Sequence, residues 1–186
     1  MTCGEVLLPI ARAAISRRLG RDMSAAEDAL WLKEKKACFV TLMLNRQLRG
    51  CIGSLEAYRT LLEDVKENAI AAAFREPRFP PLTLDELDET RIEVSLLSPA
   101  VPIRFANEED ALRQLCPGVD GVILQYAQQR ATFLPQVWHK LAEPAKFMGE
   151  LKLKAGLKDN FWDEGIRLYR YTVEKWREQE FQEAQL

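Results

Sequence analysis

The feature that most constrains the fold is a pair of short runs, ACFVTLML at 37–44 and LRGCIGS at 48–54, separated by a polar turn. The first run is rich in β-branched and aromatic residues, which favour a buried strand. The NRQ that follows it supplies turn chemistry, so the two runs predict a β-hairpin. Glycine weakens a strand, and a strand that carries both Gly50 and Gly53 therefore needs a reason for each.

Helical and strand-like segments alternate along the chain without a regular βαβ repeat. Helical spacing is clear at 5–19 and at 60–76, where Thr60 and Glu63 form a capping box. The alternation at 91–98 predicts a strand with one apolar face. Further helices are expected at 107–115, 135–142 and 143–156, and further strands at 122–128, 130–134 and 165–176. The pattern predicts an α+β fold with a largely antiparallel sheet and flanking helices.

Composition narrows the class of protein. The chain has 186 residues, of which 47% are hydrophobic, and its net charge is -2. These values suit one folded domain, and they give no global positive field that would attract nucleic acid or an anionic membrane. No apolar run approaches the roughly 20 residues that span a bilayer. The N-terminus reads as an amphipathic helix rather than a secretory signal, so we expect a cytoplasmic protein.

The cysteines and histidine limit metal and cofactor chemistry. The four cysteines at 3, 38, 51 and 116 form no C-x-x-C pair, and His139 is the single histidine. We therefore expect reduced thiols, no metal site and an exposed His139. The sequence also lacks the G-x-G-x-x-G, P-loop, G-x-S-x-G and H-E-x-x-H motifs, so no cofactor is predicted.

Seven short motifs follow one another in a distinctive order: LRGCIGS, PRFPPLT, EVSLLSP, DGVIL, ATFLPQVW, KAGL and YRY. In this order, from about residue 5 to about 177, they resemble the AMMECR1 domain family, which in microbes is called AmmeMemoRadiSam system protein A. The resemblance implies one AMMECR-type domain over 1–186, with two unequal, intertwined α+β subdomains and a tail from about 177. It also implies a cleft between the subdomains near LRGCIGS.

The resemblance implies partner proteins but identifies no reaction. It implies Memo-like and radical-SAM proteins as partners, and the activity of the family is unsettled. One departure is visible: this chain has Asp120 where many relatives have a histidine before the glycine of DGVIL. A mechanism that needs a histidine at that point is therefore in doubt here.

Cys51 is the candidate nucleophile, and two interpretations of it stay open. A free cysteine in an apolar strand is usually a packing residue. Alternatively, Gly50 and Gly53 let a ligand or another backbone approach the thiol closely. Arg49, two residues away, is expected on the same face of the strand, and a nearby guanidinium favours the thiolate.

The remaining candidates surround this cysteine in the interpretation as a catalytic site. Glu93 is the proposed acid or base, and the residues expected to bind substrate are Arg49, Gly50, Gly53, Arg78, Ser95 and Thr132. Simpler interpretations compete: Glu93 and Ser95 face water, Arg78 lies on a surface turn beside a core Phe79, and Thr132 caps a helix near 135.

Two functions from different classes follow. The first is an enzyme or enzyme subunit that uses Cys51 on a small molecule or a modified residue together with its partners. The alternative is a non-catalytic binding or adaptor module for a protein or peptide. The oligomeric state stays open, and we expect 174–186 to form a solvated tail or a short helix.

Overall fold

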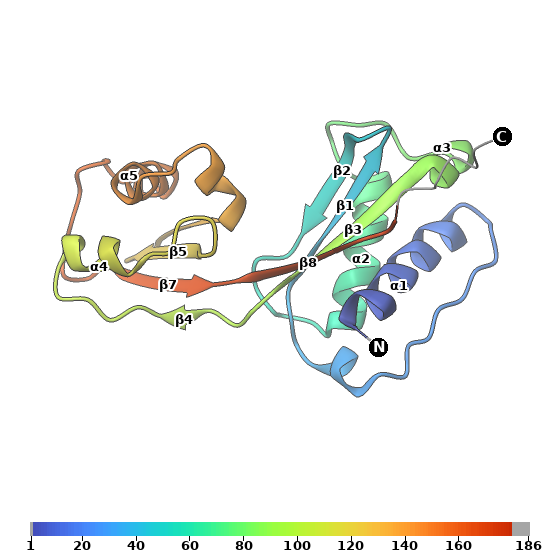
Figure 1. Ribbon diagram of the computed structural model, residues 1–186, viewed down its shortest axis with the longest axis horizontal. Helices are drawn as coiled ribbons and strands as arrows, with labels where there is room; N and C mark the ends of the chain where they lie inside the picture. The colour runs from blue at the N-terminus through green and yellow to red at the C-terminus, as the bar shows by residue number, and fades with distance from the viewer. Residues whose placement is uncertain (1, 180–186) are drawn as a thin grey trace. The chain divides into compact units, whose positions relative to one another are not determined.

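The computed structural model describes residues 2–179 and divides the chain into two compact units, each with its own four-stranded antiparallel sheet (Figure 1). Unit 1 comprises 1–97 together with 174–186, and unit 2 comprises 98–173. The predicted α+β class, with antiparallel sheets and flanking helices, is confirmed. Each unit is built around a separate hydrophobic core.

Unit 1 has a sheet in the order β2-β1-β3-β8. Its elements are α1 (Cys3–Arg18), η1 (Leu30–Lys33), β1 (Cys38–Leu44), β2 (Gln47–Gly53), α2 (Leu61–Phe74), α3 (Leu84–Glu89), β3 (Thr90–Leu97) and β8 (Val173–Arg177). The predicted hairpin is β1–β2, and it turns at Asn45 and Arg46, whose φ angles are 51° and 62°. Positive φ at both central residues matches the twist of the flanking strands.

The core of unit 1 lies on one face of this sheet. Val40, Leu42, Ile92 and Val94 point into it, and all four helical elements contribute apolar side chains to the same cluster. In Figure 1, α1 and α2 lie side by side along this face. The residues that alternate with the core positions point to the opposite side, which we call the open face of unit 1.

The C-terminal segment is a correction to the prediction. The segment 165–176 was expected to be one strand, and it forms two, β7 (Arg167–Tyr171) in unit 2 and β8 in unit 1. Residues 174–177 lie in β8, so the expected tail does not begin at 174. Trp176 packs against the core beside Gly4, a position where a side chain would overlap with the indole ring. Residues 180–186 of the predicted tail lie outside the described residues.

Unit 2 has a sheet in the order β4-β7-β5-β6. Besides β7, its elements are β4 (Val101–Pro102), α4 (Glu108–Gln114), β5 (Gly121–Tyr126), β6 (Gln129–Phe133), η2 (Pro135–His139) and α5 (Pro144–Lys154). Its core stacks Trp138 on Phe147, with ring centroids 3.7 Å apart. As predicted, His139 is exposed.

The prediction missed the short helix α3. Thr83 and Glu86 form a capping box at its start, the same signature that identified α2. Three prolines lie just upstream at 77, 80 and 81, and proline disfavours a helix interior, so no helix was expected in this region. The signal for α3 was therefore present in the sequence, and the helix is consequential because Glu86 pairs with Arg49.

Candidate functional site

Cys51 lies in the edge strand β2, in a row of polar side chains that crosses the open face. Cys51 is opposite Thr41 of β1, and Thr41 is opposite Glu93 of β3. Main-chain bonds from Glu178 to Ile92 and from Ser98 to Thr172 set the register of β8, so Arg177 is opposite Glu93. We call Cys51, Thr41, Glu93 and Arg177 the polar row. Adjacent strands are about 4.8 Å apart, so Cys51 and Glu93 are separated by roughly 10 Å at their Cα atoms.

The contacts of Cys51 leave its thiol partly accessible. The side chain is half-buried, and Thr41 Oγ1 donates a hydrogen bond to Sγ over 3.3 Å. The Cys51 N–H donates to Glu76 Oε2 at 3.2 Å. Since that N–H faces the free edge of the sheet, Cys51 and Thr41 form a non-hydrogen-bonded pair, the kind whose side chains lie closest.

A pair of charges, Glu76 and Arg78, holds the edge of β2 at Cys51. Glu76 is only 5% exposed, and Arg78 donates to both of its oxygens, at 3.0 and 2.8 Å. These bonds from Arg78, aided by the Cys51 N–H, lower the pKa of Glu76 to about 2. In turn, the bonds to Glu76 raise the pKa of Arg78, and the charges of Glu76 and Cys51 add to that shift. Arg78, which is exposed, is therefore a cation near the thiol.

Arg49 does not have the predicted arrangement. In the pairing of β1 with β2, Met43 is opposite Leu48 and Leu42 is opposite Gly50. Arg49 therefore has no residue opposite it in β1 and is the extra residue of a β-bulge. Simple alternation therefore does not apply between Arg49 and Cys51.

The guanidinium of Arg49 is directed to α3 and the loop before it. It donates to both oxygens of Glu86, at 2.9 and 3.0 Å, and to Pro80 O at 2.9 Å. These bonds lower the pKa of Glu86 to about 2. Nη1 has no hydrogen-bond partner among residues 2–179, and the guanidinium carbon lies 5.8 Å from the centroid of the half-buried Phe79 ring. Arg49 thus has a structural role, and its predicted part in substrate binding stays a prediction.

The two glycines have packing explanations. A Cβ on Gly50 would overlap with the main-chain oxygen of Ala72, so Gly50 lets α2 approach β2 closely. A Cβ on Gly53 would overlap with the ring of Phe39, which is opposite it in β1. Each glycine therefore makes room for a neighbour of its own unit, and ligand contact at either stays a prediction.

Glu93 and Ser95 differ from the prediction that they face water, because both are buried although they lie on the open face. Burial alone would raise the pKa of Glu93, but hydrogen bonds from Lys175 and Arg177 outweigh burial and the pKa is lowered. The distances to its oxygens are 2.8 Å from Lys175 and 2.6 Å from Arg177. A paired carboxylate of this kind stays ionised at neutral pH, which argues against a role as general acid.

Thr132 is the one candidate that belongs to unit 2. Its Oγ1 lies 3.1 Å from the Tyr171 hydroxyl, which also donates to Phe133 O. The Tyr171 ring lies over Gly121, where a Cβ would overlap with it. The other seven candidates belong to unit 1. The predicted cleft between subdomains, and a contribution of Thr132 to the Cys51 site, stay predictions.

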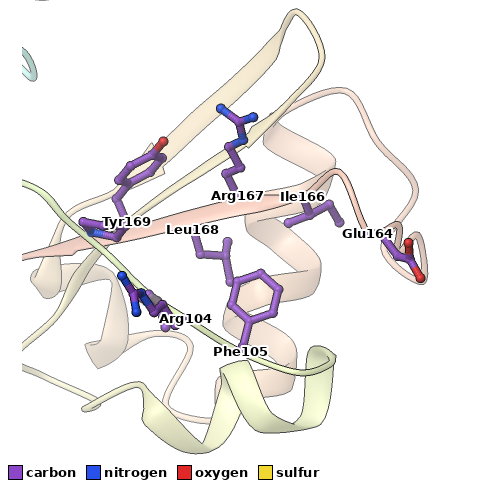
Figure 2. A pocket seen from close by; sticks show the side chains of 9 residues that line it. Arg104, Phe105, Glu164, Ile166, Arg167, Leu168 and Tyr169 are labelled. Carbon is purple, nitrogen blue, oxygen red and sulfur yellow. The ribbon is translucent and has the colours of Figure 1, made fainter.

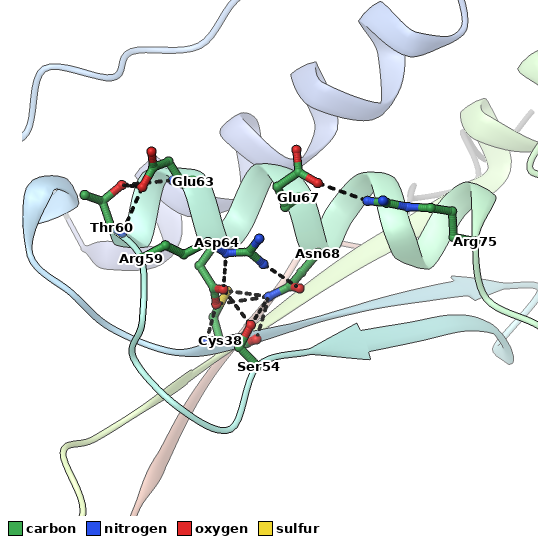
Figure 3. Close-up of polar contacts among 9 residues, drawn as sticks. All are labelled: Cys38, Ser54, Arg59, Thr60, Glu63, Asp64, Glu67, Asn68 and Arg75. Atoms are coloured by element: carbon green, nitrogen blue, oxygen red, sulfur yellow. Dashed lines mark hydrogen bonds and ion pairs between the residues drawn. The ribbon is translucent and has the colours of Figure 1, made fainter.

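Sequence reasoning missed a buried cluster centred on Asp64 (Figure 3). Asp64 is fully buried, and its oxygens accept hydrogen bonds from Cys38 N, Asn68 Nδ2, Ser54 Oγ and Arg59 Nε at 2.6–3.0 Å. The cluster ties α2 to the start of β1 and to the end of LRGCIGS. A signal was present, because Asp64 and Asn68 lie on the apolar stripe of α2 with Leu61 and Ala72.

Asp120 also has a structural explanation. Its Oδ2 accepts the N–H of Cys116 at 2.8 Å, and its main-chain oxygen accepts Trp138 Nε1 at 2.7 Å. The carboxylate closes the turn before β5. Within residues 2–179, no three His, Cys, Asp or Glu side chains gather closely enough to hold a metal ion, and no helix there is long and apolar enough to cross a membrane.

The motif resemblance is now supported by direct comparison. The AMMECR1 family model matches residues 8–176, nearly the whole chain. The chain belongs to the AMMECR1 family. A Methanocaldococcus jannaschii relative, Protein MJ0810, is 36% identical over 182 residues, covering 95% of this chain and 90% of its own. A Thermococcus gammatolerans relative is 38% identical over 192 residues, again covering 95% and 90%.

An AMMECR1 relative also supports the fold. A crystal structure of the uncharacterised protein PH0010 from Pyrococcus horikoshii matches with a TM-score of 0.78 and 35% identity, and the match covers 95% of this chain and 91% of PH0010. The α+β architecture with two antiparallel sheets is therefore that of the family. The names of these relatives state no activity.

Proposed function

We propose that this AMMECR1 protein is an enzyme or enzyme subunit whose reactive group is the Cys51 thiol. One observation carries the proposal: Cys51 is half-buried on the open face, with Thr41 Oγ1 donating to Sγ at 3.3 Å. Arg49, Gly50, Gly53 and Ser54 of LRGCIGS have packing, ion-pair or hydrogen-bond explanations within the fold. Cys51 has a nucleophilic side chain and none of these explanations.

The surroundings suit a thiol that acts on a polar substrate. Thr41 Oγ1 donates a hydrogen bond to the Cys51 sulfur, and the exposed guanidinium of Arg78 is a cation nearby. Farther along the polar row, Lys175 and Arg177 bring two positive charges to the single negative charge of Glu93. The excess of one positive charge favours a substrate with an anionic group. Memo-like and radical-SAM partners, implied by the resemblance, would supply or consume it.

Alkylation by iodoacetamide at pH 7, followed by mass spectrometry, tests the proposal with controls inside the chain. Cys116 is exposed, Cys3 is half-buried, and Cys38 is fully buried with a pKa raised by that burial. We expect Cys51 to label in the folded protein, before Cys38, because its side chain is partly accessible and that of Cys38 is buried. Thr41→Val, which removes the hydroxyl donor, should slow labelling of Cys51 several-fold and leave Cys116 unchanged. If Cys51 labels only after denaturation, as Cys38 should, the proposal fails.

The alternative is a binding or adaptor module. The observation that favours it is that a ligand-sized groove lies within unit 2 and is not lined by Cys51. An assay of the chain assembled with Memo-like and radical-SAM proteins separates the two functions, when the chain is compared with its Cys51→Ser variant. A module should keep its partners after Cys51→Ser and show no dependence on the thiol in any assay of the assembled proteins. An enzyme should keep its partners but lose turnover.

A further inference from the structure

We propose that unit 2 carries a second ligand site, a groove that binds a small organic anion with an aromatic body. The groove has a volume of about 330 Å³ and lies between the segment 102–105 and β7 (Figure 2). This size falls in the range of small-molecule sites, about 300–1,000 Å³. The groove is independent of Cys51, so this proposal and the proposed function can fail separately.

The groove opens where one segment leaves the sheet. Ile103 N donates to Leu168 O at 2.9 Å, and beyond this bond the chain continues through Arg104 and Phe105 toward α4. Ile103, Ile166 and Leu168 are buried residues that line the groove, and they give it an apolar floor. Figure 2 shows Tyr169 and Leu168 on opposite sides of β7, with Phe105 on the same side as Leu168.

Aromatic rings suit this groove to a flat ligand body. Phe105 and Tyr169 are half-buried residues that line the groove. Phe105 is held in place by Trp162, with ring centroids 5.5 Å apart. Offset stacking and edge contacts between aromatic rings contribute beyond the area that they bury. An aromatic ring is therefore the ligand body that these walls favour.

The charged residues of the groove identify an anion. Among the described residues, three of the sixteen arginines, Arg18, Arg104 and Arg167, have a guanidinium without a hydrogen-bond, ion-pair or ring partner. Arg18 lies in the last turn of α1, where the helix dipole favours a cation. Arg104 and Arg167 have no such explanation, and both line the groove. Carboxylate and phosphate are the groups that a guanidinium binds with two parallel hydrogen bonds.

Glu164 also lines the groove, and Figure 2 shows it at the end away from Arg104. Its negative charge repels an anion from that end. The acidic group of the ligand is therefore expected at the end of the groove near Arg104, with the ring over the apolar floor, and Arg167 adds a second positive charge from the Tyr169 side of β7 (Figure 2). Replacing Glu164 by glutamine should strengthen binding of an anion rather than weaken it.

The test is an NMR titration of the full-length chain with phenyl phosphate and, in parallel, with benzoate, which distinguishes phosphate from carboxylate as the preferred group. Inorganic phosphate lacks the ring, and benzyl alcohol lacks the charge. We expect saturable shifts at the main-chain amides of Ile103 and Leu168 and at the Trp162 indole N–H for at least one aromatic anion. Inorganic phosphate and benzyl alcohol should both bind more weakly than the aromatic anion, because the first lacks the ring and the second lacks the negative charge.

Variants make the test decisive. Arg104→Gln and Arg167→Gln should each weaken binding about fivefold, the size expected for a partly exposed charged contact. Arg18→Gln removes an equally unpaired arginine in the other unit and should change nothing, as should Cys51→Ser. Binding that survives the double variant R104Q/R167Q, inorganic phosphate that matches phenyl phosphate, or an absence of saturable shifts would each overturn the proposal.

Discussion

Two polar clusters lie on the sheet of unit 1, and they differ in how completely their polar groups are hydrogen-bonded and buried. Around Asp64, both carboxylate oxygens accept two hydrogen bonds each and the side chain is fully buried. In the polar row, Cys51 has one side-chain contact of 3.3 Å and is half-buried. A closed, fully satisfied cluster stabilises the fold, because leaving any member unpaired is costly. An open cluster keeps bonding capacity for a ligand. Within LRGCIGS, Ser54 belongs to the closed cluster and stabilises the fold, whereas Cys51 belongs to the open cluster and is available for chemistry.

The largest effect is expected at the closed cluster. Asp64→Ala should lower the free energy of unfolding by about 4 kcal/mol, because it leaves several buried donors without an acceptor. Urea denaturation measures it. The matched control is Glu67→Ala on the same helix, which breaks only the exposed pair with Arg75 shown in Figure 3. That change should cost less than about 0.5 kcal/mol, and equal losses at both positions would contradict the distinction.

Gly50→Ala should be the next largest change. The new methyl group would overlap with the oxygen of Ala72, so α2 must shift from β2, at a cost of about 2 kcal/mol. Gly149→Ala is the control, because its Cβ would lie 3.8 Å from Asp159, in ordinary contact, within α5. There alanine should stabilise by about 0.5–1 kcal/mol. A stabilised Gly50→Ala in thermal or urea denaturation would show that close packing does not explain this glycine.

The ion pair of Arg49 with Glu86 predicts a pH dependence. The pKa of Glu86 is lowered from 4.5 to about 2 in the folded protein, so its contribution is complete above about pH 4.5 and lost as the pH falls toward 2. Glu86→Gln should cost about 1.5 kcal/mol at pH 7, where Arg49 loses a charged partner, and almost nothing at pH 2. Urea denaturation across this range measures both.

Glu76 has a pKa lowered to about 2 as well, so it contributes in the same pH window. The Glu86→Gln variant should therefore keep part of the acid sensitivity, and Glu76→Gln should remove a further part, while Glu93, whose pKa is also lowered, keeps some of it. An unchanged pH profile in E86Q would mean that the pair with Arg49 does not stabilise the fold.

The smallest effect on stability is expected at the open cluster. Cys51→Ser should change the free energy of unfolding by less than about 0.5 kcal/mol, since the side chain is half-buried and makes one weak contact. Cys38→Ser, at a fully buried thiol, should cost about 1 kcal/mol or more because it buries a hydroxyl. If Cys51→Ser proves the more damaging, Cys51 is a packing residue and the comparison between the clusters collapses.

The sequence predicted the elements better than the site. The hairpin, the cap of α2 and the α+β class followed from local patterns that the structure confirms. The expected alternation between Arg49 and Cys51 does not apply because a bulge interrupts it, and a helix that was not recognised supplies Glu86 as the partner of Arg49. Thr41 and Arg177 were missed because their relation to Cys51 and Glu93 depends on strand register across the sheet, which no local pattern contains.

What the sequence alone determined is local: where strands and helices form, which residues cap them, and which thiol sits in a glycine-flanked strand. Those properties depend on propensity and spacing within a few residues. The tertiary structure decided which groups meet. Long-range pairing placed Thr41 beside Cys51 and gave Glu93 the cations of β8. It also left Arg104 and Arg167 beside a groove without partners among residues 2–179. The physical reason is that charge, hydrogen bonding and burial act through space, between residues as far apart as 93 and 177.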